Sequence, residues 1–371
     1  MENITVKSSL KVALLAGMES IDFKVLYCLY REFNNIYVIS NDKESILKSS
    51  RYKKKYIYIP WSAKSEDQEN NIAAIKDFFD ENGVDFIITG GCDSSIFLDK
   101  YKDSFPNQKF FPTLDYKTLQ QIDHKWTFTE KLVKEDIPTP KTFYIDKESK
   151  IDETSRKRIE QEIGFPLMVK PVLSDGSLGV RKIKSFDALR DHIFGEHAYN
   201  DFPLVIQKFV EGSDASFCYL ALNGEVLHFC IKVFLNEDEV EYYDHPEIEA
   251  LGRKIIKFYK MTGPGNFDIR IDKHTGKIYV IECNPRFWRS VTASMWCGLN
   301  YPEAMIRKTM GLEYNAERPM GNYILTGKKV KMLARKPWKY FSFSKSEKEE
   351  IWFNLTDIGP QLALFMRRFK D

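Results

Sequence analysis

Apolar and polar positions along the first hundred residues predict strands and helices in turn. Short apolar runs predict four strands, at residues 11–17, 35–41, 55–60 and 84–91. Apolar residues at helical spacing predict two helices, at residues 22–33 and 70–83. Strands that alternate with helices pair in parallel through right-handed crossovers. We therefore expect a Rossmann-like layer at the start of the chain.

A glycine-rich loop at residues 89–95 follows the last of these strands. Ligands of open parallel sheets bind at the carboxyl ends of the strands, so this loop is a candidate to touch one. A glycine turn followed by an Asp or Ser helix cap explains the same residues equally well. The first strand is not followed by G-x-G-x-x-G, so we expect no dinucleotide site there.

The middle of the chain combines a buried-type lysine with a glycine-rich loop. Residues 122–145 predict a helix with an Asp cap that ends before Pro138 and Pro140, then a strand. Residues 165–183, "FPLMVKPVLSDGSLGVRKI", predict a strand ending near Lys170, a loop and a second strand. Such a loop can enclose an anion, because glycine lets backbone N–H groups converge. Taken alone, a lysine before proline is usually a surface strand end, and a Gly-Ser loop is usually a turn.

Residues 265–286, "GNFDIRIDKHTGKIYVIECNPR", predict two strands joined by the turn "KHTG". If these strands are antiparallel, Asp268 lies near Glu282, and Asn284 lies two residues further on the same face. Two carboxylates and an amide oxygen would repel one another without a cation, and Mg²⁺ prefers such oxygen ligands. Arg286 follows on the same side and can bind an oxyanion bidentately. A solvated face with an ordinary salt bridge explains any one of these residues.

Composition limits the class of protein. The chain has 371 residues, of which 43% are hydrophobic, so it can form two or three domains. A net charge of +2 provides no long-range field toward nucleic acid or membranes. The six cysteines lack CxxC spacing, which is typical of reduced thiols in a cytosol. No apolar segment approaches about 18 residues, so we expect a cytoplasmic protein without a membrane span.

Together, the motifs of residues 122–312 resemble the ATP-grasp superfamily, in particular carboxylate-amine ligase-like members such as D-alanine:D-alanine ligase and biotin carboxylase. Five elements occur in the family's order: Asp123 with Lys125, the strand lysine Lys170, the loop "DGSLG", the hinge "QKFVEG" and the cluster "D…ECNPR". The resemblance implies an α/β chain whose ATP-grasp domain has two lobes, with the nucleotide between two antiparallel sheets. The implied division is a Rossmann-like domain at 1–118, an ATP-grasp domain at 119–312 (small lobe about 125–205, large lobe about 206–312) and a C-terminal extension at 313–371.

The resemblance also implies roles for individual residues. Phosphate contacts and a closing loop are implied for Lys125, Lys170, Ser174, Asp175, Gly176, Ser177 and Gly179. A hinge that holds the adenine, and an acidic residue that binds the ribose, are implied for Gln207, Lys208, Phe209, Val210 and Asp214. Ligation of Mg²⁺ or Mn²⁺ is implied for Asp268, Glu282 and Asn284. Arg286 matches the arginine that steadies the transferring group, and with Lys170 it is implied in catalysis.

Two positions depart from the family's pattern. The hinge often has a glutamate where this chain has Gln207, and many relatives have a small residue where this chain has Arg289. The first departure leaves adenine binding intact, whereas the second leaves the substrate open, because Arg289 can reach toward the acceptor. Strand alternation points Cys283 away from Glu282 and Asn284, so we expect a packed core thiol without a covalent role.

The activity implied by the resemblance is an ATP- and Mg²⁺-dependent ligase that activates a carboxylate as an acyl phosphate and couples it to an amine. Its partners are then small-molecule carboxylates and amines, and no nucleic acid. A homodimer is one possible assembly. Two alternatives use the same site: an ATP-grasp kinase that phosphorylates a small acceptor, and a non-catalytic nucleotide-binding module. The basic and aromatic tail, 314–371, is expected to pack on the ligase core, with a membrane-surface or partner-binding helix at 358–369 as the alternative.

Overall fold

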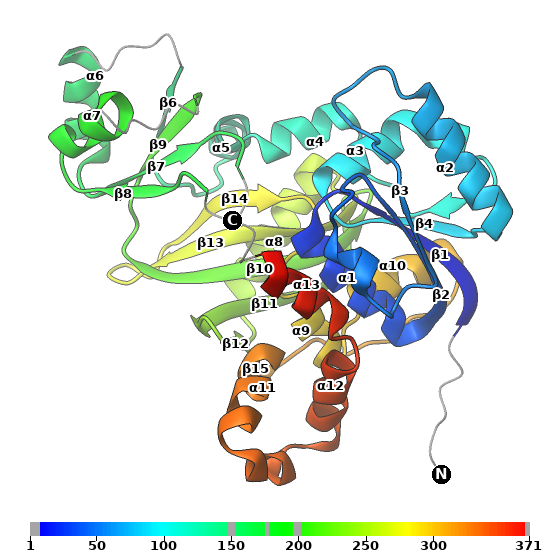
Figure 1. Ribbon diagram of the computed structural model, residues 1–371. Helices are drawn as coiled ribbons and strands as arrows, with labels where there is room; N and C mark the ends of the chain where they lie inside the picture. Colours follow the sequence, from blue (N-terminus) through cyan, green and yellow to red (C-terminus); the bar gives the residue numbers. More distant parts are fainter. Residues whose placement is uncertain (1–7, 147–152, 175–177, 196–201, 368–371) are drawn as a thin grey trace.

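The computed structural model describes residues 8–146, 153–174, 178–195 and 202–367, and within them the chain forms three sheets (Figure 1). The N-terminal sheet is parallel, with strand order β3-β2-β1-β4-β5. The other two sheets are antiparallel, one with order β6-β9-β7-β8 and one with order β14-β13-β10-β11-β12-β15. The expected succession of a Rossmann-like layer and two antiparallel sheets is thus confirmed.

The N-terminal layer follows the apolar pattern of the sequence closely. Its strands are β1 (Ser8–Ala16), β2 (Phe33–Ser40), β3 (Lys55–Tyr58), β4 (Phe86–Thr89) and β5 (Lys109–Phe110). Its helices are α1 (Glu19–Glu32), α2 (Glu69–Asn82), α3 (Cys92–Tyr101) and α4 (Tyr116–Asp123), with a short 3₁₀ turn η1 (Ile46–Ser49). Val12 and Leu14 of β1 enter one core, whereas Ala13 and Leu15 enter another. A strand covered on both faces needs an unbroken apolar run, which explains "VALLA".

The loop at residues 89–95 is a tight strand-to-helix turn whose polar groups bond within it. Ser94 and Ser95 each donate a hydrogen bond to the carbonyl of Gly91, and the hydroxyls of Thr89 and Ser95 lie 2.9 Å apart. Gly90 has no room for a side chain, because a Cβ there would lie 1.9 Å from Oδ1 of Asp22. The described contacts therefore support the explanation of these glycines as a turn that leads into a helix.

The four-stranded sheet forms a small lobe with a core of its own. Its strands are β6 (Thr142–Ile145), β7 (Leu167–Pro171), β8 (Arg181–Ile183) and β9 (Leu204–Lys208). Its helices are α6 (Glu153–Arg158), the π-helical turn η3 (Ile159–Ile163) and α7 (Phe186–Phe194), while α5 (Lys125–Lys134) contacts both β6 and β14 and buries Phe128 and Leu132 in the core of the large sheet. The predicted Asp cap of α5 is wrong: His124 is the cap, and its Nδ1 accepts from the Thr127 amide. Asp123 instead ends α4, because that helix continues up to the cap.

The six-stranded sheet is the largest of the three described sheets. Its strands are β10 (Gly212–Leu222), β11 (Glu225–Asn236), β12 (Glu239–Tyr242), β13 (Gly263–Asp272), β14 (Ile278–Asn284) and β15 (Gly321–Ile324). Helix α8 (Pro246–Tyr259) packs on β10 and β11, while α9 (Val291–Trp296) and α10 (Tyr301–Thr309) contact α1. The hairpin between β10 and β11 turns at Asn223 and Gly224, whose φ angles of 51° and 86° suit an Asn-Gly turn.

The tail packs on the body of the molecule, as expected. Strand β15 pairs with β12, and α11 (Thr326–Arg335), η4 (Pro337–Ser342), α12 (Lys345–Leu355) and α13 (Gly359–Arg367) follow it. Asp357 accepts hydrogen bonds from Ser50 Oγ at 2.6 Å and from the Arg51 amide at 2.7 Å, which joins the tail to the N-terminal layer. Over the described ranges, every helix is too short or too polar to cross a bilayer.

A buried ion pair links two helices of the tail, α11 and α12. Lys329 Nζ lies 2.6 Å from Glu350 Oε2, and the two side chains are 1% and 2% exposed. Tyr323 and Thr326 donate hydrogen bonds to the other carboxylate oxygen, so every charge is compensated. A buried pair of this kind adds little by itself, but loss of one partner leaves an isolated charge in a dry site.

We predict that Glu350→Ala lowers the free energy of unfolding by about 3 kcal/mol, because the buried Lys329 then keeps only the more distant carboxylate of Glu347, 3.7 Å away. Urea denaturation followed by circular dichroism measures the change. Glu66→Ala, which removes an exposed glutamate, is the matched control and should change stability by less than about 0.5 kcal/mol. Equal stability of the two variants would contradict the role of the pair.

Candidate active site

The hairpin of β13 and β14 places two carboxylates directly opposite each other. Asp268 pairs in register with Glu282, and a bulge follows Asp268. Three donors face the Asp268 carboxylate: Ser216 Oγ at 3.2 Å and Asn266 Nδ2 at 2.8 Å reach Oδ1, and Asn284 Nδ2 at 3.1 Å reaches Oδ2. The sequence prediction that Asp268, Glu282 and Asn284 converge is therefore confirmed in the geometry.

The carboxylate pair is electrostatically strained. Burial, and then the charge of Glu282, raise the pKa of Asp268 to about 7, from an ordinary value of 3.8. Hydrogen bonds from the three donors do not bring the pKa of Asp268 back to its ordinary value. A divalent cation would offset the repulsion between the two carboxylates, and for that reason these residues fit Mg²⁺.

Across the described residues, no cluster of three or more His, Cys, Asp or Glu side chains is arranged to hold a metal. The two carboxylates suit a Mg²⁺ that completes its coordination with phosphate oxygens and water. Asn284 would join them as an oxygen ligand only if its amide turned over, because here its Nδ2 faces Asp268 and its Oδ1 accepts from Arg286.

Two buried lysines face this pair. Lys125, the first residue of α5, lies 3.9 Å from Glu282 Oε2 and donates a 2.9 Å hydrogen bond to the Ser174 carbonyl. Lys170, at the end of β7, donates to Gln207 Oε1 at 3.0 Å. Burial lowers the pKa of Lys170, while the negative charge of Glu282 opposes that shift. Both lysines are only 8% exposed, so the explanation of Lys170 as a surface strand end is wrong.

Gln207 of β9 links Lys170 of β7 to Thr142 of β6 within the small-lobe sheet. It is 3% exposed, and its Nε2 donates to Thr142 Oγ1 at 3.0 Å while its Oε1 accepts from Lys170. Both ends of the amide are thus satisfied. A glutamate at this position would compensate the Lys170 charge, whereas the neutral amide leaves that charge available to a ligand.

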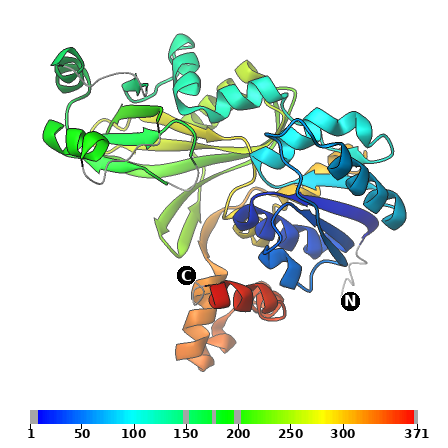
Figure 2. The same ribbon diagram turned by 45° about the horizontal axis from the view of Figure 1, so that its top comes forward.

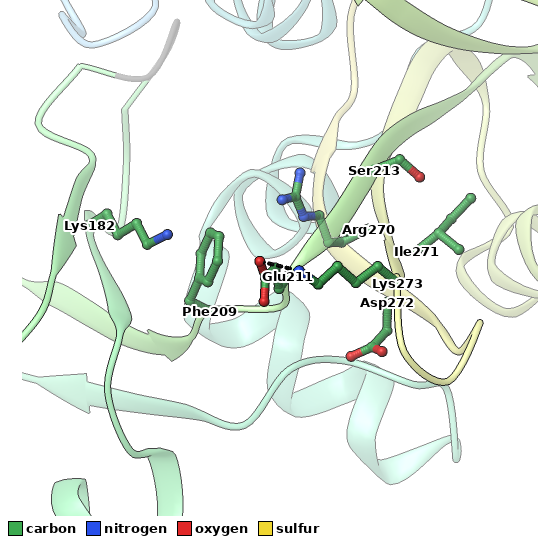
Figure 3. Close-up of a pocket in the computed structure, with 9 residues that line it drawn as sticks. Lys182, Phe209, Glu211, Ser213, Arg270, Ile271, Asp272 and Lys273 are labelled. Atoms are coloured by element: carbon green, nitrogen blue, oxygen red, sulfur yellow. Dashed lines mark hydrogen bonds and ion pairs between the residues drawn. The ribbon is translucent and has the colours of Figure 1, made fainter.

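A pocket of about 570 Å³ opens beside the hinge (Figure 3). Arg270 organises it: its Nε donates to the Val210 carbonyl at 2.8 Å, and its Nη1 lies 2.6 Å from Asp214 Oδ1. Lys182 Nζ lies 3.6 Å from the Phe209 ring centre, and Figure 3 shows this amine directed toward the ring. The lining residues are Lys182, Phe209, Glu211, Gly212, Ser213, Arg270, Ile271, Asp272 and Lys273.

The other predicted residues lie as follows. Lys208 ends β9, and its amide donates to the Lys141 carbonyl. Arg286 donates to Asn284 Oδ1 and to the Phe287 carbonyl, each at 3.1 Å, so it stands beside the carboxylate cluster. Arg289 is exposed. Gly179 is described, with a φ of 72°, while the predicted loop residues Asp175, Gly176 and Ser177 lie outside the described residues.

Cys283 is confirmed as a core thiol. It is 4% exposed and its Sγ lies 3.8 Å from the Tyr219 hydroxyl, on the face of the sheet away from the carboxylates. Burial raises its pKa well above the ordinary value. The thiolate is therefore disfavoured, and covalent chemistry at this residue is disfavoured with it.

Sequence analysis missed one charged residue of the cluster, Lys232. It is 4% exposed, pairs in register with Ser216, and donates a hydrogen bond to Ser290 Oγ. Glu282, Asp268, Ser216 and Lys232 therefore form one row across four adjacent strands. The signal was present, because "FCIKVF" places a lysine inside an apolar strand just as "LMVKP" does.

Comparison with known protein families identifies the domain in which the carboxylate cluster lies. Residues 122–290 match the family model of the ATP-grasp domain. Residues 122–290 are an ATP-grasp domain. The match covers α5, both antiparallel sheets except β15, and the carboxylate cluster.

Curated relatives match the ATP-grasp domain and its surroundings. D-alanine–D-alanine ligase B of Chromobacterium violaceum is 29% identical over 170 aligned positions, and the alignment covers 40% of this chain and 52% of that protein. D-aspartate ligase of Enterococcus faecium is 25% identical over 230 aligned positions, and that alignment covers 55% of this chain and 53% of that protein. The chain thus spans about half the length of these curated relatives.

Solved structures share the fold over most of the chain. N5-carboxyaminoimidazole synthetase from Staphylococcus aureus, complexed with ADP, has a TM-score of 0.66 and 14% identity, and the match covers 91% of this chain and 87% of that chain. L-amino acid ligase from Bacillus licheniformis has a TM-score of 0.58 and 18% identity, and the match covers 84% of this chain and 76% of that chain. The likeness therefore extends from the ATP-grasp domain to the N-terminal layer.

We predict that Glu282→Gln stabilises the ligand-free protein, and more so at pH 8 than at pH 6. The raised pKa of Asp268 means that its contribution to the free energy of unfolding is complete below about pH 4 and is lost as pH rises through about 7. Removing the charge of Glu282 relieves part of that loss, on the order of 1 kcal/mol.

The measurement is Tm without nucleotide at both pH values. Glu225→Gln, at the exposed start of β11, is the control and should leave Tm unchanged. Because Glu282→Gln also removes the partner of Lys125 at both pH values, the comparison between them is decisive. A change in Tm at pH 8 no more favourable than that at pH 6 would show that the two carboxylates do not repel.

Proposed function

We propose that this chain is an ATP-dependent ligase that activates a carboxylate as an acyl phosphate and joins it to an amine, with release of ADP and phosphate. One observation carries the proposal: Asp268 and Glu282 of the large sheet face Lys125 and the small-lobe residue Lys170. A binding module has no need of a complete set of metal-type ligands and phosphate-type cations. The names of the relatives, which are ligases of amino acids, support the same activity.

In this proposal each lobe contributes a different part of the nucleotide site. The hinge 207–210 would hold the base through its backbone, with Arg270 fixing the Val210 carbonyl in place. Asp214 would bind the ribose hydroxyls once its partner Arg270 adjusts. Lys125, Lys170 and the loop 174–179 would hold the phosphates. The proposed domain division at about residues 118 and 312 follows the same assignment.

The proposed chemistry brings together two anions, a carboxylate and a triphosphate. Mg²⁺, held by Asp268, Glu282 and Asn284, would supply positive charge that neutralises phosphate oxygens. Lys125, Lys170 and Arg286 would provide fixed positive charge around the transferring group, and such preorganised charge carries most of the catalysis in phosphoryl transfer. Lys232 would add a fourth cation from the centre of the sheet. None of these roles requires a nucleophilic side chain.

The decisive experiment is a screen of amino acids and small acids, alone and in pairs, for stimulated ADP release. Release of ADP together with free phosphate and a coupled product indicates the ligase. Release of ADP with a phosphorylated product and no free phosphate indicates a kinase, and no ADP with any acceptor indicates a binding module. Glu282→Gln, which keeps the fold, should lose turnover by at least about 100-fold and is the control for contaminating ATPase.

We predict that Lys170→Ala weakens binding of ATP by about 10–100-fold and leaves binding of adenosine nearly unchanged. The reason is that only ATP carries the phosphate charge that this lysine meets, and a charge-assisted hydrogen bond contributes about 1.5–3 kcal/mol. Isothermal titration calorimetry with both ligands measures the difference. Lys184→Ala, at an exposed position after β8, is the matched control. Equal weakening of both ligands would assign Lys170 to folding.

A further inference from the structure

The tail carries an unusual concentration of exposed apolar side chains. Of the twenty large apolar residues exposed in the described chain, nine lie between residues 338 and 366. Two of them, Trp338 and Phe341, belong to the short turn η4 and are 64% and 83% exposed. Trp352 of α12 stands beside that turn, because its Nε1 donates a 2.9 Å hydrogen bond to Tyr340. Three large aromatic side chains therefore gather around one turn in water.

The same segment is strongly basic. Residues 326–348 contain eight Lys and Arg against one Glu, although the whole chain has a net charge of only +2. Five of these cations are exposed and form no ion pair with any described residue: Lys331, Arg335, Lys336, Lys339 and Lys345. We call these five residues, together with Trp338, Phe341 and Trp352, the basic–aromatic surface.

The basic–aromatic surface rests on a rigid support. The buried pair of Lys329 and Glu350 joins α11 to α12, and Phe343 and Ile351 are 8% and 0% exposed between them. A capping box formed by Ser344 and Glu347 fixes the start of α12. The exposed aromatic side chains are thus held outward by a packed helical hairpin, and a local failure to fold does not explain them.

We propose that the basic–aromatic surface docks this protein on an anionic lipid bilayer. Unpaired lysines and arginines are attracted to an anionic leaflet, and tryptophan and phenylalanine favour the boundary between headgroups and acyl chains. The next helix supports a lipid partner over a nucleic acid. Exposed Leu362, Leu364 and Met366 of α13, with Ile358 just before it, are aliphatic and suit hydrocarbon, while bases stack mainly on aromatic rings.

The position of the tail is compatible with docking during catalysis. Figures 1 and 2 both show α11 and α12 on the side of the six-stranded sheet away from the small-lobe sheet. A bilayer on that side would leave the hinge pocket open to water. Docking is peripheral, since the described helices include none able to span a membrane.

The test is flotation of the full-length protein with vesicles of phosphatidylcholine alone, or of phosphatidylcholine with 30 mol% phosphatidylglycerol. We expect binding only to the anionic vesicles, and loss of binding in high salt. Each basic residue near such a surface contributes about fivefold in partition, so Lys336→Gln/Lys339→Gln should weaken binding about 30-fold. Trp338→Ala/Phe341→Ala should weaken it at least tenfold. The control Lys184→Gln/Phe194→Ala removes one exposed cation and one exposed ring from the small lobe and should bind unchanged.

A second readout places the surface in the lipid. Chain-brominated phosphatidylcholine in the anionic vesicles should quench tryptophan fluorescence of the wild type, and Trp338→Phe should show clearly less quenching at equal binding. Thermal melting confirms that each variant is folded. Equal binding to both vesicle types, unchanged binding of the lysine and aromatic variants, or binding to a single-stranded oligonucleotide without binding to vesicles would each overturn the proposal.

Discussion

The pairing of β13 with β14 brings two carboxylates together on one face of the central sheet, and the rest of the site is organised around that repulsion. A protein gains nothing by burying like charges unless something of opposite charge joins them. Here the β10 and β13 side chains donate hydrogen bonds to Asp268, and Lys125 approaches Glu282 from α5. The small-lobe strand β7 then contributes Lys170, whose ammonium group interacts with the charges of Glu282 and Asp268. The fold thus brings cations from α5 and the small-lobe sheet to carboxylates of the large sheet.

Much of this arrangement followed from the sequence, for identifiable physical reasons. Strand alternation and the turn "KHTG" were sufficient to place Asp268 opposite Glu282, since a hairpin's register follows from its turn and its apolar face. The apolar run of β1 was an equally local signal. Residue roles at the nucleotide came only from the resemblance to a family, and they remain proposals.

Features that depend on distant parts of the chain escaped the sequence. The cap of α5 was assigned to the wrong residue, because Asp123 and His124 are both capable caps and the end of α4 decides between them. Lys232 was overlooked because its significance appears only when β10 and β11 are placed beside β13. The ion pair of Arg270 with Asp214 likewise requires two strands to be adjacent. Long-range pairing, unlike periodicity, leaves no mark within a short window of sequence.

The neutral amide of Gln207 beside Lys170 has a consequence for the charge of the empty cleft. With an acid at that position, Lys170 would already be balanced before any ligand arrived. With the amide, four cationic side chains, Lys125, Lys170, Lys232 and Arg286, stand around the carboxylates of Asp268 and Glu282, so positive charge exceeds negative charge in the cleft. Such a cleft attracts a triphosphate more strongly than it attracts a free divalent cation. A divalent cation therefore enters most readily together with the phosphates that neutralise the excess.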